Sequence, residues 1–374
     1  MANNMNSGGV YKVITSQSGS PCPHPWFDVW INASGMVYCC PQNRTVNGNI
    51  ISEEFSEIWN SSSSQSVRSL IANGYYEEAG CQRECLFLRG TYNPPAIHPP
   101  SDELINPDFD YVYDGSVYSQ NLSFVIDAYQ RKSPLVNAFP LFVDIQPTVI
   151  CNSNCIMCKQ PHDNNITLPM SVYAKLSLLK PYANYFRWQG GEVFILDWFM
   201  DYLMEFDDID YPHLYRYVIT NGSLFDKDKI LLLLDKGRPV HFLVSMDGVR
   251  QETYGRIRRN LDIENVMFTI ELLSDIQREK KLNNMVRWNY VVMKSTLEDM
   301  MHAVDIADEL CVNLNFAPIQ GDFKNENIFL YPDITKLNLQ NYFNEIETYS
   351  ATKNINISGL IGIKYRLRNI KLEK

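Results

Sequence analysis

The chain has 374 residues, of which 45% are hydrophobic and 20% charged, a composition typical of a globular protein with more than one domain. Its formal net charge of −10 disfavours a general nucleic-acid binder, because phosphate neutralisation requires clustered Lys and Arg. Apolar runs are too short to span a bilayer, and the polar start of the chain does not resemble a secretory signal. We therefore expect a cytoplasmic protein with no membrane partner.

The nine cysteines are unevenly distributed along the chain. Cytoplasmic thiols are not expected to form disulfides, so thiols that occur in groups indicate metal ligands. Two groups and one separate residue can be distinguished: Cys22, Cys39, Cys40, Cys81 and Cys85; then Cys151, Cys155 and Cys158; and finally Cys311. This grouping predicts metal binding at two places.

The N-terminal part of the chain is predicted to hold a small cysteine-rich module. Residues 1–20 are rich in Asn, Ser and Gly and are expected to form a mobile arm. Residues 21–90 form the module, with a hairpin over 29–38 whose two alternating segments flank a turn. A short amphipathic helix opened by Ser52 follows, and a second helix is predicted over 62–74.

The next segment, residues 91–138, contains several prolines and is expected to be a connector over the surface without regular elements. Residues 139–320 then alternate between strand and helix patterns, which predicts a parallel sheet with crossover helices. The strands are expected near 141–147, 183–188, 214–220, 240–246, 286–293 and 312–318, and the helices near 168–180, 195–206, 224–236, 262–280 and 296–310.

Six strand–helix units are fewer than the eight of a complete barrel, so we predict an α/β fold with an open, partial (β/α)6 barrel. Such a barrel would leave a lateral mouth for a substrate. Residues 321–374 are expected to add one helix, near 335–349, and a tail about which the sequence gives no information beyond residue 350.

Cys151, Cys155 and Cys158 directly follow the first predicted strand, at the edge where barrel active sites are built. Three thiolates on one loop could each bind a different iron of a cubane cluster and leave the fourth iron open. Two alternatives remain at this point: reactive redox thiols, or a zinc site with a fourth ligand such as His162.

The CxxxCxxC spacing at this position resembles the signature of the radical S-adenosylmethionine (AdoMet) superfamily. The resemblance implies a [4Fe–4S] cluster that binds AdoMet at its open iron. Met157 occupies a position that is often aromatic in the family and packs near the adenine; a methionine can also cover a flat ring.

Further segments carry the same resemblance. Gly190-Gly191-Glu192 resembles the family segment that holds the amino group of AdoMet, and Thr220-Asn221-Gly222 ends the third strand as in many relatives. Ser245 and Asp247, with Arg258 after them, resemble the stretch that lies near the ribose or the methionyl carboxylate. Each of these residues could instead be a turn residue or a solvated charge.

The first cysteine group resembles the auxiliary-cluster module called SPASM, or twitch in its reduced form, here placed before the barrel instead of after it. The matching segments are Cys22-Pro23-His24-Pro25-Trp26, Gly35-Met36-Val37-Tyr38-Cys39-Cys40, Gly48-Asn49-Ile50, Glu57-Ile58-Trp59-Asn60 and Cys81-Gln82-Arg83-Glu84-Cys85. Five thiols suffice for one auxiliary [4Fe–4S] cluster, for which we expect Cys22, Cys40, Cys81 and Cys85 as ligands and Cys39 as a spare. A zinc knuckle on the same thiols is the alternative.

The resemblance implies an enzyme that cleaves AdoMet reductively to a 5′-deoxyadenosyl radical and abstracts hydrogen from its substrate, using a flavodoxin- or ferredoxin-type reductant. We expect oxidation or epimerisation of a small polar metabolite, such as a sugar, an aminocyclitol or a nucleotide-linked sugar. A maturase acting on a ribosomal peptide is the alternative, and a non-catalytic iron–sulfur electron carrier is a more remote one. If the product is an epimer, Cys311 could be the hydrogen donor.

Overall fold

The computed structural model describes residues 10–13, 21–82, 85, 109–160, 165–206, 210–236, 240–282 and 284–369. Within the expected N-terminal arm, residues 10–13 form a strand, β1 (Val10–Val13), which pairs antiparallel with β5 (Phe109–Val112). The prediction of a mobile arm is therefore wrong for these four residues. The rest of residues 1–20 lies outside the described residues.

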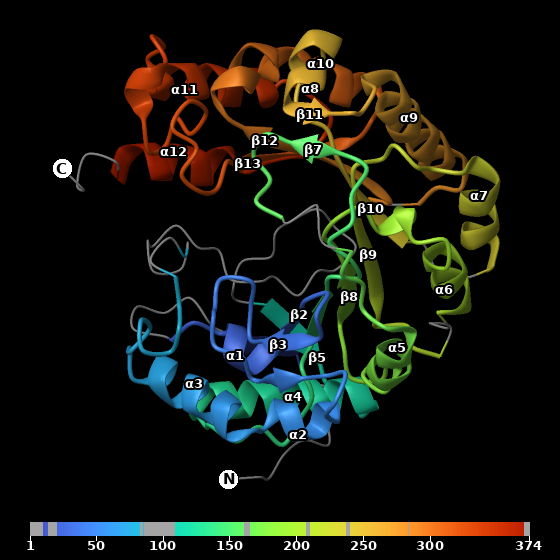
Figure 1. Ribbon diagram of the computed structural model, residues 1–374, viewed down its shortest axis with the longest axis vertical. Helices are drawn as coiled ribbons and strands as arrows, with labels where there is room; N and C mark the ends of the chain where they lie inside the picture. The colour runs from blue at the N-terminus through green and yellow to red at the C-terminus, as the bar shows by residue number, and fades with distance from the viewer. Residues whose placement is uncertain are drawn as a thin grey trace.

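A single curved sheet organises the part of the chain that the structure describes (Figure 1). Its order is β14-β13-β12-β10-β9-β8-β6-β2-β3-β4. The strands are β2 (Asp28–Ile31), β3 (Met36–Tyr38), β4 (Gly48–Asn49), β6 (Phe142–Ile145), β8 (Tyr185–Trp188), β9 (Tyr215–Thr220), β10 (Val240–Ser245), β12 (Val286–Val292), β13 (Asn313–Pro318) and β14 (Ile357–Ser358).

Strands β6, β8, β9, β10, β12 and β13 are parallel and coincide with the six predicted ones, so the partial-barrel prediction is confirmed. Helices follow along the outer side of the sheet, as Figure 1 shows. They are α5 (Met170–Ser177), α6 (Phe199–Glu205), α7 (Lys227–Lys236), α8 (Gln251–Ile257), α9 (Ile263–Glu279), α10 (Met300–Glu309), α11 (Leu339–Ser350) and α12 (Leu360–Asn369).

The two faces of the sheet differ in character. On the outer face, Trp188 is fully buried and its ring meets Phe199 and Tyr202 of α6 edge-on. Successive side chains of a strand point to opposite faces of the sheet. In β12 the side chains are accordingly buried and half-buried in strict alternation. The apolar core lies under the helices, and the inner face remains available to a ligand.

The N-terminal module is joined to the barrel through this sheet. Strand β2 pairs parallel with β6, in a register that places Asp28 opposite Phe142. The predicted hairpin is confirmed as β2 and β3, and the two predicted helices are found as α2 (Phe55–Trp59) and α3 (Ser62–Ala72). The predicted start of the first helix at Ser52 is wrong, because α2 begins after Glu54. A further short helix, α1 (His24–Phe27), precedes β2. The module therefore extends the barrel sheet at its first strand.

The expectation that residues 91–138 lack regular elements is wrong. Helix α4 (Val117–Gln130) begins after Ser116, whose hydroxyl accepts a hydrogen bond from the amide of Ser119 at 3.1 Å. The prolines that suggested an irregular segment end at Pro107, and a serine cap followed by fourteen residues without proline is sufficient for a helix. Residues 91–108 of the connector, like residues 86–90 of the module, lie outside the described residues.

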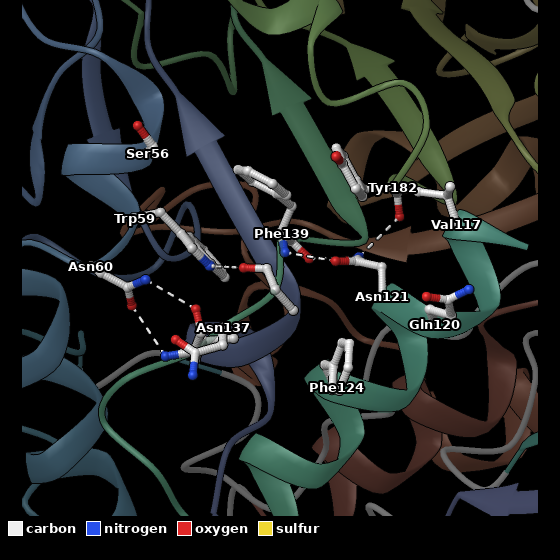
Figure 2. A pocket seen from close by; sticks show the side chains of 12 residues that line it. Ser56, Trp59, Asn60, Val117, Gln120, Asn121, Phe124, Asn137, Phe139 and Tyr182 are labelled. Carbon is white, nitrogen blue, oxygen red and sulfur yellow. Dashed lines mark hydrogen bonds between the residues drawn. The ribbon is translucent and has the colours of Figure 1, made fainter. Parts of the chain in front are cut away.

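Side-chain amides tie the connector to both of its neighbours, and Figure 2 shows these bonds around a surface pocket of about 320 Å³. The amide of Asn121 on α4 donates to the carbonyls of Phe139 and Tyr182 at 2.9 and 3.3 Å. The amide of Asn60, from the module, donates to the carbonyl of Val136 at 2.9 Å. These side-chain amides bind backbone carbonyls, so they hold the connector against its neighbours and are not free for a ligand. No cysteine lines this pocket.

The C-terminal segment also contributes to the sheet. Strand β14 pairs parallel with β13, with Ser358 opposite Asn315, and α12 follows it directly. A regular structure beyond residue 350 was not predicted, because a strand of two residues is too short to show a sequence pattern.

Candidate active site

The loop that carries Cys151, Cys155 and Cys158 follows β6, and a strand from a later part of the chain pairs with it. Its residues Asn154–Cys155 form β7, which pairs antiparallel with β11 (Arg258–Arg259) and sets Arg258 opposite Cys155. The three thiols are half-buried. The segment after α8, remote in sequence, therefore fixes the conformation of the cysteine loop.

Polar hydrogens point at the sulfur atoms of this loop. The amide of Ser153 donates to Sγ of Cys151 at 3.4 Å, and Nδ2 of Asn221 lies 4.0 Å from the same sulfur. The guanidinium of Arg258 lies 4.0 Å from Sγ of Cys155. Burial raises the pKa of the Cys151 and Cys158 thiols, and the neighbouring thiols raise it further. Metal binding displaces these protons, and the donors then stabilise the thiolates.

The backbone of the glycine pair after β8 packs closely against the cysteine loop. Gly191 has a φ of +57°, and a Cβ at this position would lie 2.2 Å from the carbonyl oxygen of Ile150, the residue before Cys151. The amide of Gly191 donates to the side chain of Gln160 at 2.8 Å. The close backbone approach requires glycine here, and it connects the second strand to both ends of the cysteine loop.

Glu192 is fully buried, and its carboxylate is hydrogen-bonded within the protein. It accepts from the hydroxyl of Thr220 and the amide of Asn221, both at 2.7 Å. Burial raises the pKa of Glu192, whereas these hydrogen bonds lower it. The side chain of Asn221 in turn donates to Asn152 of the cysteine loop at 2.8 Å. Glu192 thus positions the turn after β9 against the loop.

The other predicted cofactor contacts lie at the same edge of the sheet. Asp247 is fully buried and accepts from Nε of Arg258 at 2.8 Å and from the amide of Val291 at 2.6 Å. Burial raises the pKa of Asp247, and the charge of Arg258 lowers it. Ser245 ends β10, and Met157 lies half-buried in the cysteine loop. The Asp247–Arg258 pair therefore links the fourth strand to Cys155.

Two residues of this network were not predicted: Asn152 and Gln160. Their signal in the sequence was only that they lie within or next to the cysteine motif. Polar residues in such a loop are common, and only the structure shows that Asn152 and Gln160 bond to the segments after β9 and β8.

The five N-terminal thiols line one cavity of about 570 Å³. Cys22, Cys39 and Cys40 are buried, and Cys81 and Cys85 are half-buried. Cys39 donates to Cys40, and this hydrogen bond, followed by the charge of His24, lowers the pKa of Cys40 to about 7. Cys39 and Cys40 both reach the cavity, so either thiol can approach a metal centre there.

The zinc alternative requires several donors to converge on one ion, at about 2.3 Å for sulfur. In the described part of the chain, no group of three or more His, Cys, Asp or Glu side chains converges in this way. A cubane needs a wider arrangement, because each thiolate binds a different iron atom. Thiols spread around one cavity are compatible with such a cluster. His162 lies outside the described residues.

The cavity of the N-terminal thiols also reaches the barrel. Its lining includes Lys159, which directly follows Cys158, and Gln320 and Asp322, which follow β13. The side chain of Gln42 in the module lies 3.5 Å from that of Gln320. The cavity of the N-terminal thiols therefore extends to the residue that follows the third cysteine of the loop.

Cys311 does not reach this space. It is exposed, has a φ of +53° and lies in the turn before β13, at the amino end of that strand. The cysteine loop lies at the carboxyl ends of the strands, on the opposite edge of the sheet. The assignment of Cys311 as hydrogen donor is corrected accordingly: a thiol on the opposite edge cannot deliver a hydrogen atom to a substrate near Cys151.

Comparison with known families agrees with this geometry. The profile of the radical SAM superfamily matches residues 145–307, and that of the SPASM iron-sulfur cluster-binding domain matches residues 22–86. The chain belongs to the radical SAM superfamily. As a radical SAM protein with a SPASM region, it binds a [4Fe–4S] cluster with AdoMet and an auxiliary cluster.

Among solved structures, Streptococcus suis SuiB bound to S-adenosylmethionine is similar, with 15% identity over 79% of this chain and 65% of SuiB, at a TM-score of 0.49. AnSMEcpe with bound AdoMet has 22% identity over 59% of this chain and 64% of its own, at 0.44. A radical SAM methyltransferase from Sphaerobacter thermophilus has 12% identity over 59% and 67%, also at 0.44.

The chain thus spans somewhat less than two thirds of SuiB and anSMEcpe. No curated protein matches it. Among the helices described, none is long and apolar enough to cross a membrane.

Proposed function

We propose that this radical SAM protein abstracts a hydrogen atom from a small polar metabolite and completes a two-electron oxidation of it. The observation that carries the proposal is the reach of one cavity, which is lined by the five N-terminal thiols and by Lys159, the residue next to Cys158.

The inner face of the sheet supports a polar substrate. Ser245, Asn289, Asn315 and Ser358 lie side by side on β10, β12, β13 and β14. Asn315 donates to Asn289 at 3.3 Å and accepts from Ser358 at 2.8 Å. Hydroxyl and carboxamide groups both donate and accept, so this row suits a substrate with several hydroxyl or amino groups.

When bound, AdoMet on the cluster of Cys151, Cys155 and Cys158 supplies the hydrogen-abstracting radical, and the auxiliary cluster supplies a one-electron acceptor. The chain's own residues orient these groups. Glu192 and Asn221 hold the turn after β9 against the loop, and Arg258 lies between Asp247 and Cys155. Oxidation is favoured over epimerisation because Cys311, the thiol outside both groups, lies at the wrong edge of the sheet.

The test is an anaerobic incubation of the reconstituted protein with AdoMet, dithionite and a deuterated metabolite pool. We expect deuterium in 5′-deoxyadenosine and one metabolite lighter by two hydrogens. The same incubation with a flavodoxin- or ferredoxin-type reductant should give the same product. The matched control is the variant in which Cys151, Cys155 and Cys158 are replaced by Ala. If deuterium enters only from added peptides, the small-metabolite proposal is wrong; if it never enters, hydrogen abstraction is wrong.

A further inference from the structure

Strand β8, in the middle of the sheet, carries an arginine on the face that is turned away from the helices. Trp188 points outward to α6, and successive side chains of a strand point to opposite faces, so Arg187 points inward. The side chain of Arg187 is 30% exposed, although β8 lies between β6 and β9 within the sheet. Because helices cover the outer face, this exposure is to the interior of the partial barrel.

Asp144 of β6 lies opposite Arg187 in register and holds the guanidinium in a fixed orientation. Nε and Nη2 of Arg187 donate to Oδ1 and Oδ2 of Asp144 at 2.6 and 2.8 Å. Asp144 is buried, so its carboxylate is not itself presented to the interior. Two parallel hydrogen bonds of this kind fix the plane of the guanidinium and therefore the direction of its remaining N–H groups.

The third nitrogen of the guanidinium, Nη1, has no acceptor among the described residues. The charges of Arg187 and Asp144 offset each other. Asp28, another carboxylate whose charge reaches Arg187, is itself paired with His24 at 3.1 Å. The pair therefore offers oriented N–H donors without a net positive charge, which suits a neutral hydroxyl or carbonyl oxygen better than an anion.

Aromatic side chains close the barrel interior beneath Arg187. Tyr185, two residues earlier on the same strand face, is buried, and its ring centre lies 5.5 Å from the guanidinium carbon of Arg187. The Tyr185 ring stacks on Phe142 at 4.9 Å and meets Tyr217 edge-on at 5.6 Å. Tyr185 and Phe142 fill the space toward the amino ends of the strands. A ligand therefore approaches Arg187 from the carboxyl ends, where the cysteine loop lies.

The distance from Arg187 to the cofactor edge of the sheet corresponds to a small metabolite. Through the pairing of β8, β9 and β10, Arg187 is level with Tyr217 and His241. Ser245 lies four residues further along β10, a rise of about 13 Å at about 3.3 Å per residue. The arginine side chain covers part of this distance, and a substrate of one or two rings covers the remainder.

From this arrangement we propose that Arg187 binds a neutral oxygen of the substrate, a hydroxyl or a carbonyl group, through Nη1. Asp144 is a positioning residue that acts through Arg187 and makes the site selective against anions. The inference rests on the proposed function and specifies its substrate class as an uncharged sugar or cyclitol. Arg187 holds the end of the substrate that lies away from AdoMet, and so orients the attacked carbon toward it.

An ion pair that only joins β6 to β8 would contribute to stability and would leave the selectivity for ligands unchanged. The two roles are separated by removing the guanidinium, and by removing only the charge of its partner. A structural pair gives no reason for the second change to improve the binding of an anion.

The experiment is calorimetric titration of the anaerobic holoenzyme, saturated with AdoMet, with glucose and myo-inositol as neutral probes and glucuronate as the anionic one. The parent should bind at least one neutral probe, and more tightly than glucuronate. Arg187→Met combined with Asp144→Asn removes the guanidinium without leaving a buried charge unpaired, and should weaken that neutral probe by about tenfold or more. Asp144→Asn alone gives the guanidinium a net charge and should tighten glucuronate by about tenfold.

Arg131→Met, which breaks an exposed ion pair on α4, is the control and should bind every probe as the parent does. Iron content and thermal unfolding verify that each variant is folded. The inference is wrong if no neutral probe binds the parent, if the double variant binds it equally well, or if Asp144→Asn leaves glucuronate binding unchanged. Since these titrations need no turnover, their failure is distinct from a failure to transfer deuterium into 5′-deoxyadenosine.

Discussion

Replacing Gly191 with Ala tests whether the backbone contact behind the cysteine loop is required for AdoMet cleavage. The new Cβ would lie 2.2 Å from the carbonyl oxygen of Ile150, whereas real Cβ contacts are essentially never shorter than 3.0 Å. Both partners are backbone atoms, so no side chain can rotate away. Ile150 precedes Cys151, and the loop must therefore move.

The magnitude follows from two separate effects. Alanine at a positive φ costs about 1–2 kcal/mol in stability wherever it occurs. The steric overlap adds a displacement of about 1 Å at the reacting groups, which can cost on the order of 100-fold in rate. Gly74→Ala separates these effects, because Gly74 has a φ of +82° and a Cβ there would meet nothing within 4 Å.

The assay compares the two variants with the parent after anaerobic reconstitution, by iron content, thermal unfolding and the rate of 5′-deoxyadenosine formation. Gly74→Ala should lose stability and retain the parental rate. Gly191→Ala should lose about 100-fold or more in rate. If Gly191→Ala forms 5′-deoxyadenosine at the rate of Gly74→Ala with the same iron content, the contact does not control the loop and the reasoning is refuted.

The reconstituted parent should contain about eight irons, and the Cys151, Cys155 and Cys158→Ala variant about four with no 5′-deoxyadenosine; a parent with about four irons and bound zinc would contradict the auxiliary cluster. Replacing Cys22, Cys40, Cys81 and Cys85 with Ala should also leave about four irons, now with AdoMet cleavage retained and substrate oxidation lost. Arg258→Met removes the ion-pair partner of the buried Asp247 and should lower the free energy of unfolding, measured with denaturant, by about 3 kcal/mol. Arg278→Met is the control: its partner Asp275 is exposed, so the free energy of unfolding should fall by less than about 1 kcal/mol. Cys311→Ala should leave the product unchanged in identity and stereochemistry. An altered stereochemistry would contradict the conclusion that Cys311 is not the hydrogen donor.

The barrel could be predicted closely because its strands and helices have strong periodic patterns. Strand β9 was expected over 214–220 and is found over Tyr215–Thr220, and α9 was expected over 262–280 and is found over Ile263–Glu279. Alternating burial and the 3.6-residue period are local signals that one sequence carries. The cysteine loop was predictable for the same reason, since its spacing is local.

What could not be predicted depends on contacts between distant segments. The pairing of β7 with β11 joins residues about a hundred positions apart, and no local pattern shows it. Arg258 was expected near the ribose or carboxylate of AdoMet, and only the fold shows that it also lies between Asp247 and Cys155. Glu192 likewise could be identified by its motif, whereas its hydrogen bonds to Thr220 and Asn221 required the neighbouring strand.

The position of the module before the barrel is explained by the same long-range pairing. Strand β2 runs parallel to β6, and helix α4 lies between them in sequence, so the module adds a strand at one end of the barrel sheet. Strand β14 adds a strand at the other end. The sheet does not close between these ends in the described residues, and residues of the module and of α12, among them Cys22 and Arg366, line one cavity. A module that precedes the barrel in sequence can therefore join it in one continuous sheet, because β2 pairs directly with the first barrel strand.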